Sequence, residues 1–271
     1  MRILVSNDDG IFARGIRVLA ERLAAEPENE VYVVAPDRER SATGHALTLH
    51  KPIRVEEVEL GANIKGAWWT TGTPSDCVKF AIGALLDERP ELVISGINSG
   101  PNLGTEILYS GTVSAAMEGA ILKVPSVAVS LVGRSVKHYE VAAEFIARLV
   151  KVADGAKLSP STLLNVNVPN LPAAEIKGVA LTELGVREYA DRYEKRVDPR
   201  GKVYYWLAGE AVEEGESETS DAWAVMHQLI SVTPVAFNMT DRDTLKRLDA
   251  WGDLKNLLSK ELSHDQVSKS R

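Results

Sequence analysis

Residues 1–10 read MRILVSNDDG, and this stretch decides the fold class. Residues 2–6 (RILVS) form a short apolar run that is typical of a buried strand. The apolar residues that follow recur at the spacing of one helix face: Ile16, Leu19, Ala20 and Leu23. Residues 31–35 (VYVVA) then predict a second strand, which Pro36 ends. Strand, helix and strand in this order predict a βαβ unit and a parallel sheet.

The same alternation continues along the chain to about Val168. Residues 73–76 (TPSD) open a helix, because Thr is a favoured N-cap and Pro is favoured at the first helical position. Further strands are expected at residues 53–58, 67–71, 91–95 and 126–131, and further helices at residues 112–123 and 139–152. The sequence therefore predicts an α/β protein with a doubly wound, largely parallel sheet.

Charged residues become frequent beyond residue 183, where a long β-hairpin is expected to project from the core. Residues 198–201 (DPRG) have the composition of a turn and lie between two extended runs, residues 188–197 and 202–207. Exposed aromatic clusters usually have partners. The aromatic residues predicted on this hairpin, Tyr204, Tyr205 and Trp206, therefore indicate a subunit interface.

We divide the chain into an α/β catalytic core, residues 1–183, and an appendage, residues 184–271. Besides the hairpin arm, the appendage is expected to contain a short helix near residues 221–229, a strand at residues 230–235 and a C-terminal helix at residues 244–262. This organisation amounts to a single domain with a C-terminal arm.

Composition narrows the class of protein. The 271 residues include 38 Asp and Glu against 31 Lys and Arg, a formal net charge of −7, so a long nucleic acid is not expected as the main partner. No apolar run approaches the roughly 20 residues of a membrane span, and the N-terminal apolar stretch is too short for a signal peptide. The single cysteine, Cys77, suits a reducing compartment. We expect a soluble, cytoplasmic protein with no membrane partner.

Two adjacent carboxylates, Asp8 and Asp9, follow the first strand, at the turn where a doubly wound sheet usually binds its ligand. This turn lacks the Gly-x-Gly-x-x-Gly pattern of a dinucleotide site. Gly10 and Gly15 have the spacing of a Walker A loop, but Ile16-Arg17 stand in place of its Lys-Ser/Thr. A single Asp would most simply cap the next helix. A like-charged pair favours a divalent cation such as Mg²⁺ or Mn²⁺.

A second loop is expected at the same edge of the sheet. Residues 95–104 (SGINSGPNLG) follow another predicted strand, and Asn98 could supply a carbonyl oxygen to the ion. Further on, Ser110, Gly111 and Thr112 offer hydroxyls and free amides at a helix N-terminus, where a phosphate binds favourably. A glycine-rich connection followed by a capped helix is the alternative interpretation.

A third loop follows the second strand at residues 37–45 (DRERSATGH). Its Ser41 could reach the ion, and its Arg38 and Arg40 could meet a phosphate. By itself this composition is equally typical of a solvated surface loop.

Four segments, VSNDDG, APDRERSATGHALTL, TTGTPSDCV and SGINSGPNLGTEILYSGTVSAAMEGA, span most of residues 1–120 and together resemble the SurE survival-protein family. The resemblance implies a metal-dependent nucleotidase that hydrolyses nucleoside 5′- and 3′-monophosphates. It also implies a Rossmann-like, three-layer core and a homodimer or homotetramer formed through the C-terminal arm. By motif, the metal ligands of the family fall on Asp8, Asp9, Ser41 and Asn98.

The expected reaction is attack of water on the phosphoryl group, assisted by one Mg²⁺ or Mn²⁺ ion per subunit. Asp8 or Asp9 is the expected proton acceptor, His45 is a weaker candidate, and residues 110–112 would hold the phosphate. One alternative is a haloacid-dehalogenase-like phosphatase with a covalent Asp nucleophile, whose second Asp lies two residues on, unlike the adjacent pair here. Another is a non-catalytic metal- or nucleotide-binding stress-response module.

Overall fold

The computed structural model describes residues 1–133, 135–156, 158–186, 188–189, 192–208, 211–212, 217–249 and 251. The chain divides into two compact units, Met1–Val235 and Ala236–Arg271. In the second unit, α6 covers Arg242–Asp249, and the rest of the helix predicted at residues 244–262 lies outside the described residues apart from Trp251. The predicted division at residue 183 stays a prediction.

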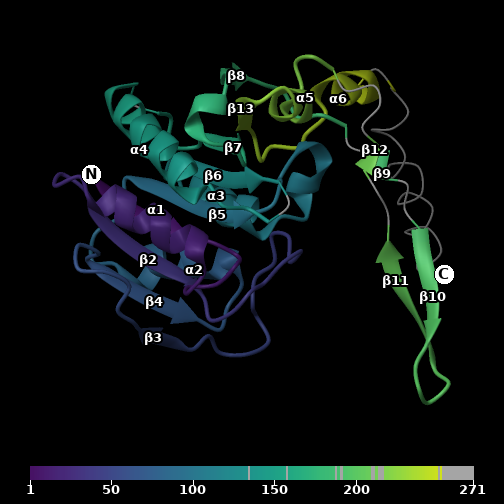
Figure 1. Ribbon diagram of the computed structural model, residues 1–271, viewed down its shortest axis with the longest axis horizontal. Coiled ribbons are helices and arrows are strands. Elements are labelled where there is room, and N and C mark those ends of the chain that lie inside the picture. Colours follow the sequence, from purple (N-terminus) through teal and green to yellow (C-terminus); the bar gives the residue numbers. More distant parts are fainter. Residues whose placement is uncertain are drawn as a thin grey trace, which may run out of the picture. The chain divides into compact units, whose positions relative to one another are not determined.

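A nine-stranded sheet forms the centre of the first unit (Figure 1), with the strand order β3-β4-β2-β1-β5-β6-β7-β13-β8. Neighbouring strands from β4 to β7 are parallel, as are β13 and β8, whereas β3 pairs antiparallel with β4 and β13 with β7. The strands are β1 Arg2–Ser6, β2 Glu30–Pro36, β3 Val55–Glu57, β4 Gly66–Thr70, β5 Leu92–Ser99, β6 Ser126–Val132, β7 Leu163–Pro169, β8 Gly178–Leu181 and β13 Leu229–Val235. This mostly parallel sheet confirms the predicted α/β, Rossmann-like fold class.

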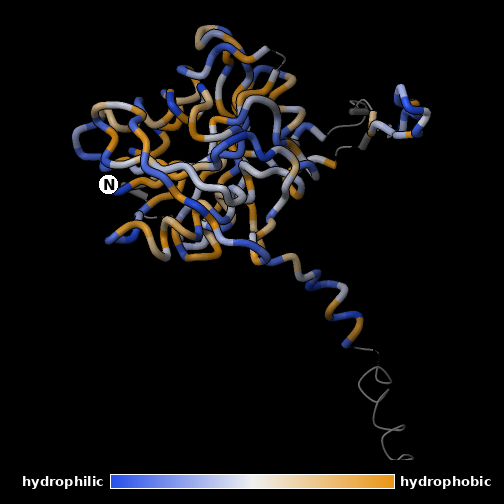
Figure 2. Tube along the Cα trace, turned by 90° about the horizontal axis from the view of Figure 1, so that it is seen from below, coloured by the Kyte–Doolittle hydropathy of each residue, from blue (hydrophilic) through white to orange (hydrophobic). Residues whose placement is uncertain are grey.

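Helices cover both faces of the sheet, which gives three layers (Figure 1). Alternate residues of β1 point to opposite faces of the sheet. Ile3 and Val5 belong to the apolar cluster on one face, and Leu4 belongs to the cluster on the other. The first cluster includes residues of α1 (Arg14–Ala24) and α4 (Tyr139–Ala156), and the second includes residues of α2 (Pro74–Phe80) and α3 (Gly111–Ile121). Figure 2 shows hydrophobic stretches running through the body of this unit.

Local sequence explains the start of α2. The Thr73 hydroxyl accepts a hydrogen bond from the Asp76 backbone N–H, and the Asp76 carboxylate accepts one from the Thr73 N–H, a complete capping box with Pro74 at the first helical position. A π-helical turn, η1 (Ala81–Leu85), ends this helix. The shorter elements of the first unit are the 3-10 helices η2 (Gly104–Leu108) and η3 (Ala173–Glu175) and the helix α5 (Asp221–Met226).

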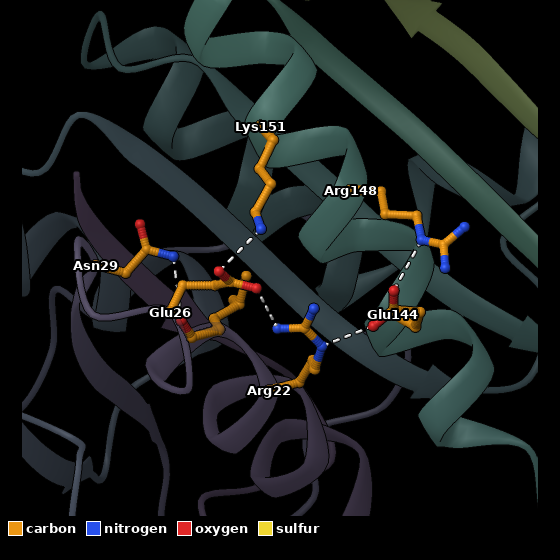
Figure 3. Close-up of polar contacts among 7 residues, drawn as sticks. Arg22, Glu26, Asn29, Glu144, Arg148 and Lys151 are labelled. Atoms are coloured by element: carbon orange, nitrogen blue, oxygen red, sulfur yellow. Dashed lines mark hydrogen bonds and ion pairs between the residues drawn. The ribbon is translucent and has the colours of Figure 1, made fainter.

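An ion-pair network ties α1 to α4 (Figure 3). Arg22 lies 2.9 Å from Glu26 and 2.7 Å from Glu144, so it joins the two helices. Arg148 lies 2.8 Å from Glu144, and Lys151 lies 2.9 Å from Glu26. The Arg22–Glu144 pair joins α1 to α4 directly, although each of these partly exposed pairs contributes little to stability by itself.

The predicted hairpin is present as a separate two-stranded sheet, in which β10 (Arg192–Val197) pairs antiparallel with β11 (Val203–Ala208). The turn is held by Asp198, whose carboxylate accepts the backbone N–H groups of Arg200 (2.8 Å) and Lys202 (2.9 Å). The first strand is shorter than predicted, because β9 (Glu188–Tyr189) pairs instead with β12 (Ala211–Val212). The aromatic residues of β11 are exposed: Tyr204, Tyr205 and Trp206.

No helix within the described ranges combines the length and the apolar character that a membrane span needs.

Candidate metal centre

The carboxyl ends of β1, β2, β4 and β5 lie at one edge of the sheet, because these neighbouring strands are parallel. Backbone bonds connect the segments that follow them. The Arg40 N–H donates to the carbonyl of Asp8 (2.7 Å), and the Ser99 N–H donates to the carboxylate of Asp9 (3.3 Å). The structure thus brings together the Asp8–Asp9 turn, the loop of residues 37–45 and the end of β5, as the sequence predicts.

Asn7 and Gly10 shape the turn that carries the two carboxylates. The Asn7 side chain donates to the Gly10 carbonyl (2.9 Å) and accepts from the Gly10 N–H (3.2 Å). Gly10 has a φ of 101°, and a Cβ there would lie 3.2 Å from the Arg38 Cα. Only glycine therefore suits both the backbone and the close approach of the neighbouring loop. Asn7 was not among the residues predicted from the sequence, although its place between a buried strand and a turn glycine is a signal for this role.

Asp8 is 6% exposed and lies against the first turn of α3. The Thr112 hydroxyl donates to its carboxylate, and a Cβ on Gly111 would lie only 2.7 Å from the Asp8 Cβ. Burial raises the pKa of Asp8, while the hydrogen bonds from Thr112 oppose that rise. Ser110 caps the helix by accepting the Val113 N–H (3.1 Å). Thr112 and Gly111 thus contact Asp8, and the phosphate-binding role of residues 110–112 stays a prediction.

Asp9 is half-buried beside Asp8, and burial together with the charge of Asp8 raises the pKa of Asp9 to about 6. The Glu39 carboxylate adds a further negative charge that raises the pKa of both groups. In the described part of the chain, neither Asp forms an ion pair with Lys, Arg or His. Two desolvated like charges without a protein cation are unfavourable, so this pair fits a bound divalent cation.

Asn98 lies near the end of β5, which continues to Ser99 past the predicted strand end at Ser95, with an irregular register against β6. Its side-chain nitrogen donates to the Gly100 carbonyl (3.0 Å). The side-chain oxygen of Asn98 is therefore the atom that can face a ligand. Because Ser99 donates to Asp9, Asn98 is held next to the carboxylate pair.

Ser41 is exposed, and its hydroxyl donates to Glu39 (2.6 Å). It directly follows Arg40, whose N–H is bonded to Asp8. No group of three or more His, Cys, Asp or Glu suited to a metal occurs among the described residues. The predicted donor set instead combines two carboxylates with a hydroxyl and an amide oxygen, which are hard oxygen ligands of the kind that Mg²⁺ and Mn²⁺ accept. Metal ligation by these four residues stays a prediction.

Two further residues of the neighbouring loop, His45 and Arg40, have protein partners. His45 lies 2.7 Å from the buried carboxylate of Glu118, which also binds Lys79 at 2.8 Å. Arg40 lies 3.0 Å from the Asp37 carboxylate. His45 and Arg40 therefore act in this structure as contacts that hold the loop.

The fold and site define an α/β protein of the doubly wound class, with two carboxylates and nearby oxygen donors at the carboxyl edge of a parallel sheet. A family model described as "Survival protein SurE" matches residues 3–191. The chain therefore belongs to the SurE family.

Individual relatives are similar in sequence over almost the whole chain. The "5'-nucleotidase SurE" of Thermosynechococcus vestitus is 55% identical over 257 residues, which cover 93% of this chain and 96% of the relative. The protein of that name from Natranaerobius thermophilus is 48% identical over 255 residues, 93% of this chain and 98% of the relative. The crystal structure of the SurE protein from Aquifex aeolicus has a TM-score of 0.80 and 41% identity, covering 93% of this chain and 100% of that chain.

Proposed function

We propose that this protein is a 5′-nucleotidase that releases phosphate from nucleoside monophosphates, at the 5′ and also the 3′ position. The name of its relatives supports the nucleotidase activity. We further propose that one Mg²⁺ or Mn²⁺ ion per subunit is held by Asp8, Asp9, Ser41 and Asn98. The observation that carries the metal proposal is the pair of desolvated carboxylates, Asp8 and Asp9, which have raised pKa values and form no ion pair with the Lys, Arg or His residues that the structure describes.

When bound, the ion would polarise the phosphoryl oxygens and lower the pKa of the attacking water. Thr112 and Gly111 hold the Asp8 carboxylate in one orientation. Without metal the pKa of Asp9 is about 6, and a bound cation would lower it, so Asp9 would be ionised at neutral pH and its free oxygen could accept a proton. The positive end of the α3 dipole favours a phosphate at this edge of the sheet.

Carboxylate variants test this proposal. Asp8→Asn and Asp9→Asn keep side-chain size but remove a formal charge, so each should abolish divalent-dependent phosphate release while the fold is kept. Asn98→Ala should raise the metal concentration needed for half activity. Wild-type-like turnover in either Asp variant would refute the metal site, and an unchanged metal titration would remove Asn98 from the ligand set.

We also propose that the β10–β11 hairpin joins subunits into a homodimer or homotetramer. Tyr205 and Trp206 are 58% and 59% exposed, more than large aromatic residues usually are without a partner. The double variant Tyr205→Lys with Trp206→Lys should lower the molar mass measured by light scattering. An unchanged mass would place the interface elsewhere.

A further inference from the structure

Asp221 is a fully buried carboxylate that bonds three separate backbone amides. One oxygen accepts the N–H of Gly104 (2.8 Å), and the other accepts those of Gly185 (3.0 Å) and Ala222 (2.9 Å). Hydrogen bonds to a buried charged acceptor are stronger than bonds between neutral groups. Asp221 therefore holds together segments that are far apart in the sequence.

Two of these segments form what we call the hairpin base, residues 183–185 and 219–222, because residues 186–218 between them include the β10–β11 hairpin. The Glu183 N–H donates to the Thr219 carbonyl (2.9 Å), and the Asp221 N–H donates to the Glu183 carbonyl (2.9 Å). The bond from Gly185 to the Asp221 side chain completes this pairing. The chain thus enters and leaves the hairpin region through one isolated parallel β-bridge, between Glu183 and Ser220.

The third segment belongs to the candidate metal centre. Gly104 lies midway along a continuous stretch from Asn98 at the end of β5 to Thr112 at the start of α3. Gly104 has a φ of 52°, so its backbone is in the left-handed region that favours glycine. Both ends of the stretch contact the candidate centre, because Ser99 is bonded to Asp9 and Thr112 is bonded to Asp8.

Other contacts show that this stretch is held by specific polar groups. Asn102 is buried, and its N–H donates to the Asn167 side chain (3.0 Å) while its own side chain donates to the Ser130 hydroxyl (2.8 Å). Asn165 and Asn167 both donate to the Asn102 carbonyl, at 2.8 and 2.9 Å. These bonds attach residue 102 to β6 and β7, whereas the bond at Gly104 attaches the stretch to the hairpin base.

We infer that Asp221 is a positioning residue that couples the hairpin base to the metal centre. Its carboxylate holds the backbone of Gly104, so a displacement of residues 183–185 or 219–222 acts on the stretch that leads to Thr112 and Asp8. This inference rests on the proposed metal site. Coupling is reciprocal, so metal binding must in turn make the Asp221-bonded amides of the hairpin base harder to open.

The variant Asp221→Asn tests the coupling at nearly constant side-chain size. An amide has a single acceptor oxygen and a donor NH₂, so it cannot accept from both Gly104 and Gly185 as the carboxylate does. The matched control is Asp198→Asn, because Asp198 also accepts two backbone amides, but in the hairpin turn. Mn²⁺ affinity is measured by electron paramagnetic resonance without substrate, and hydrogen exchange is followed by mass spectrometry in peptides covering residues 98–110 and 183–186.

For Asp221→Asn we expect faster exchange in both peptides and Mn²⁺ binding weakened about tenfold, the lower range for outer-sphere partners of metal ligands. Asp198→Asn should keep wild-type values in both measurements. In the wild type, hydrogen exchange at residues 183–186 should slow when Mn²⁺ is added. This measurement needs no variant, so it tests the coupling even if Asp221→Asn does not fold.

Unchanged Mn²⁺ affinity in folded Asp221→Asn, or metal binding without protection of residues 183–186 in the wild type, would overturn the coupling. Failure of the wild type to bind Mn²⁺ would instead overturn the proposed metal site. In that case, the claim that Asp221 positions the loop is tested by hydrogen exchange of Asp221→Asn without metal. Unchanged exchange in residues 98–110 would show that Asp221 does not position the loop.

Discussion

Replacing Gly111 by Ala should damage the metal centre without unfolding the protein. A Cβ at residue 111 would lie 2.7 Å from the Asp8 Cβ, 2.9 Å from its Oδ2 and 3.1 Å from its Cγ. Because carbon atoms in ordinary contact are about 3.5–4.0 Å apart, the Asp8 side chain must shift by about 1 Å. Asp8 is 6% exposed and bonded to Thr112, so a shift of its side chain would disturb that bond.

A displacement of about 1 Å at a catalytic group can cost on the order of a hundredfold in rate, about 2.7 kcal/mol of transition-state stabilisation. We therefore expect kcat/KM of Gly111→Ala for a nucleoside monophosphate to fall about a hundredfold at saturating Mn²⁺. Overpacking costs about 1–3 kcal/mol and the better helix propensity of Ala returns up to about 1 kcal/mol, so the fold should survive with a slightly lower Tm.

Gly83→Ala is the matched control, because a Cβ at Gly83 would meet no atom within 4 Å. This variant should keep wild-type activity. The assay is phosphate release at several Mn²⁺ concentrations, together with thermal unfolding of both variants. If Gly111→Ala kept the wild-type kcat/KM and metal titration, the position of the Asp8 carboxylate would not affect activity. The assignment of Asp8 to the metal centre would then be refuted.

Three further outcomes follow from the charges. Burial and Asp8 raise the pKa of Asp9 to about 6, so without metal its ionised form destabilises the folded state as pH rises from about 4 through 6. Asp9→Asn should thus raise the metal-free Tm at pH 7 and lose the Tm increase that Mn²⁺ gives the wild type; a lower metal-free Tm would contradict this. Thr112→Val removes a hydrogen bond that lowers the pKa of Asp8, so the acid limb of the pH–rate profile should move to higher pH and the rate should fall roughly tenfold or more, whereas an unmoved limb would refute the contact. Hydrogen bonds from Arg22 and then Arg148 hold the pKa of Glu144 below its ordinary value of 4.5. Glu144→Gln should therefore lower the Tm at pH 7, and this deficit should shrink as pH falls below about 4.5. A deficit of the same size at acid pH would exclude the ion pairs as its cause.

Much of the first unit was predictable because its elements follow local rules. The strand at residues 2–6 is found as β1, and the helix expected from Thr73 begins with the predicted cap. The meeting of Asp8, the loop of residues 37–45 and Asn98 follows from topology alone, since parallel neighbours place their carboxyl ends at one edge.

Features that depend on long-range packing were not predictable. The sequence does not show that β13 pairs antiparallel with β7 and parallel with β8, because both pairings need partners far away in the chain. Asp221 was expected merely to begin a short helix, and nothing local indicates that its side chain reaches Gly104, 117 residues away. The contact of Gly111 with Asp8 was likewise hidden, because a glycine at a helix start is equally typical of a phosphate site.

Phosphate release from a panel of nucleoside monophosphates, with and without a chelator, is the most direct test of the metal-dependent nucleotidase. We predict that purified protein releases phosphate with Mg²⁺ or Mn²⁺, loses this activity in chelator and regains it when excess metal is restored, while Asp8→Asn stays inactive throughout. Undiminished turnover in the presence of chelator, or no release from any nucleotide with either metal, would contradict the account.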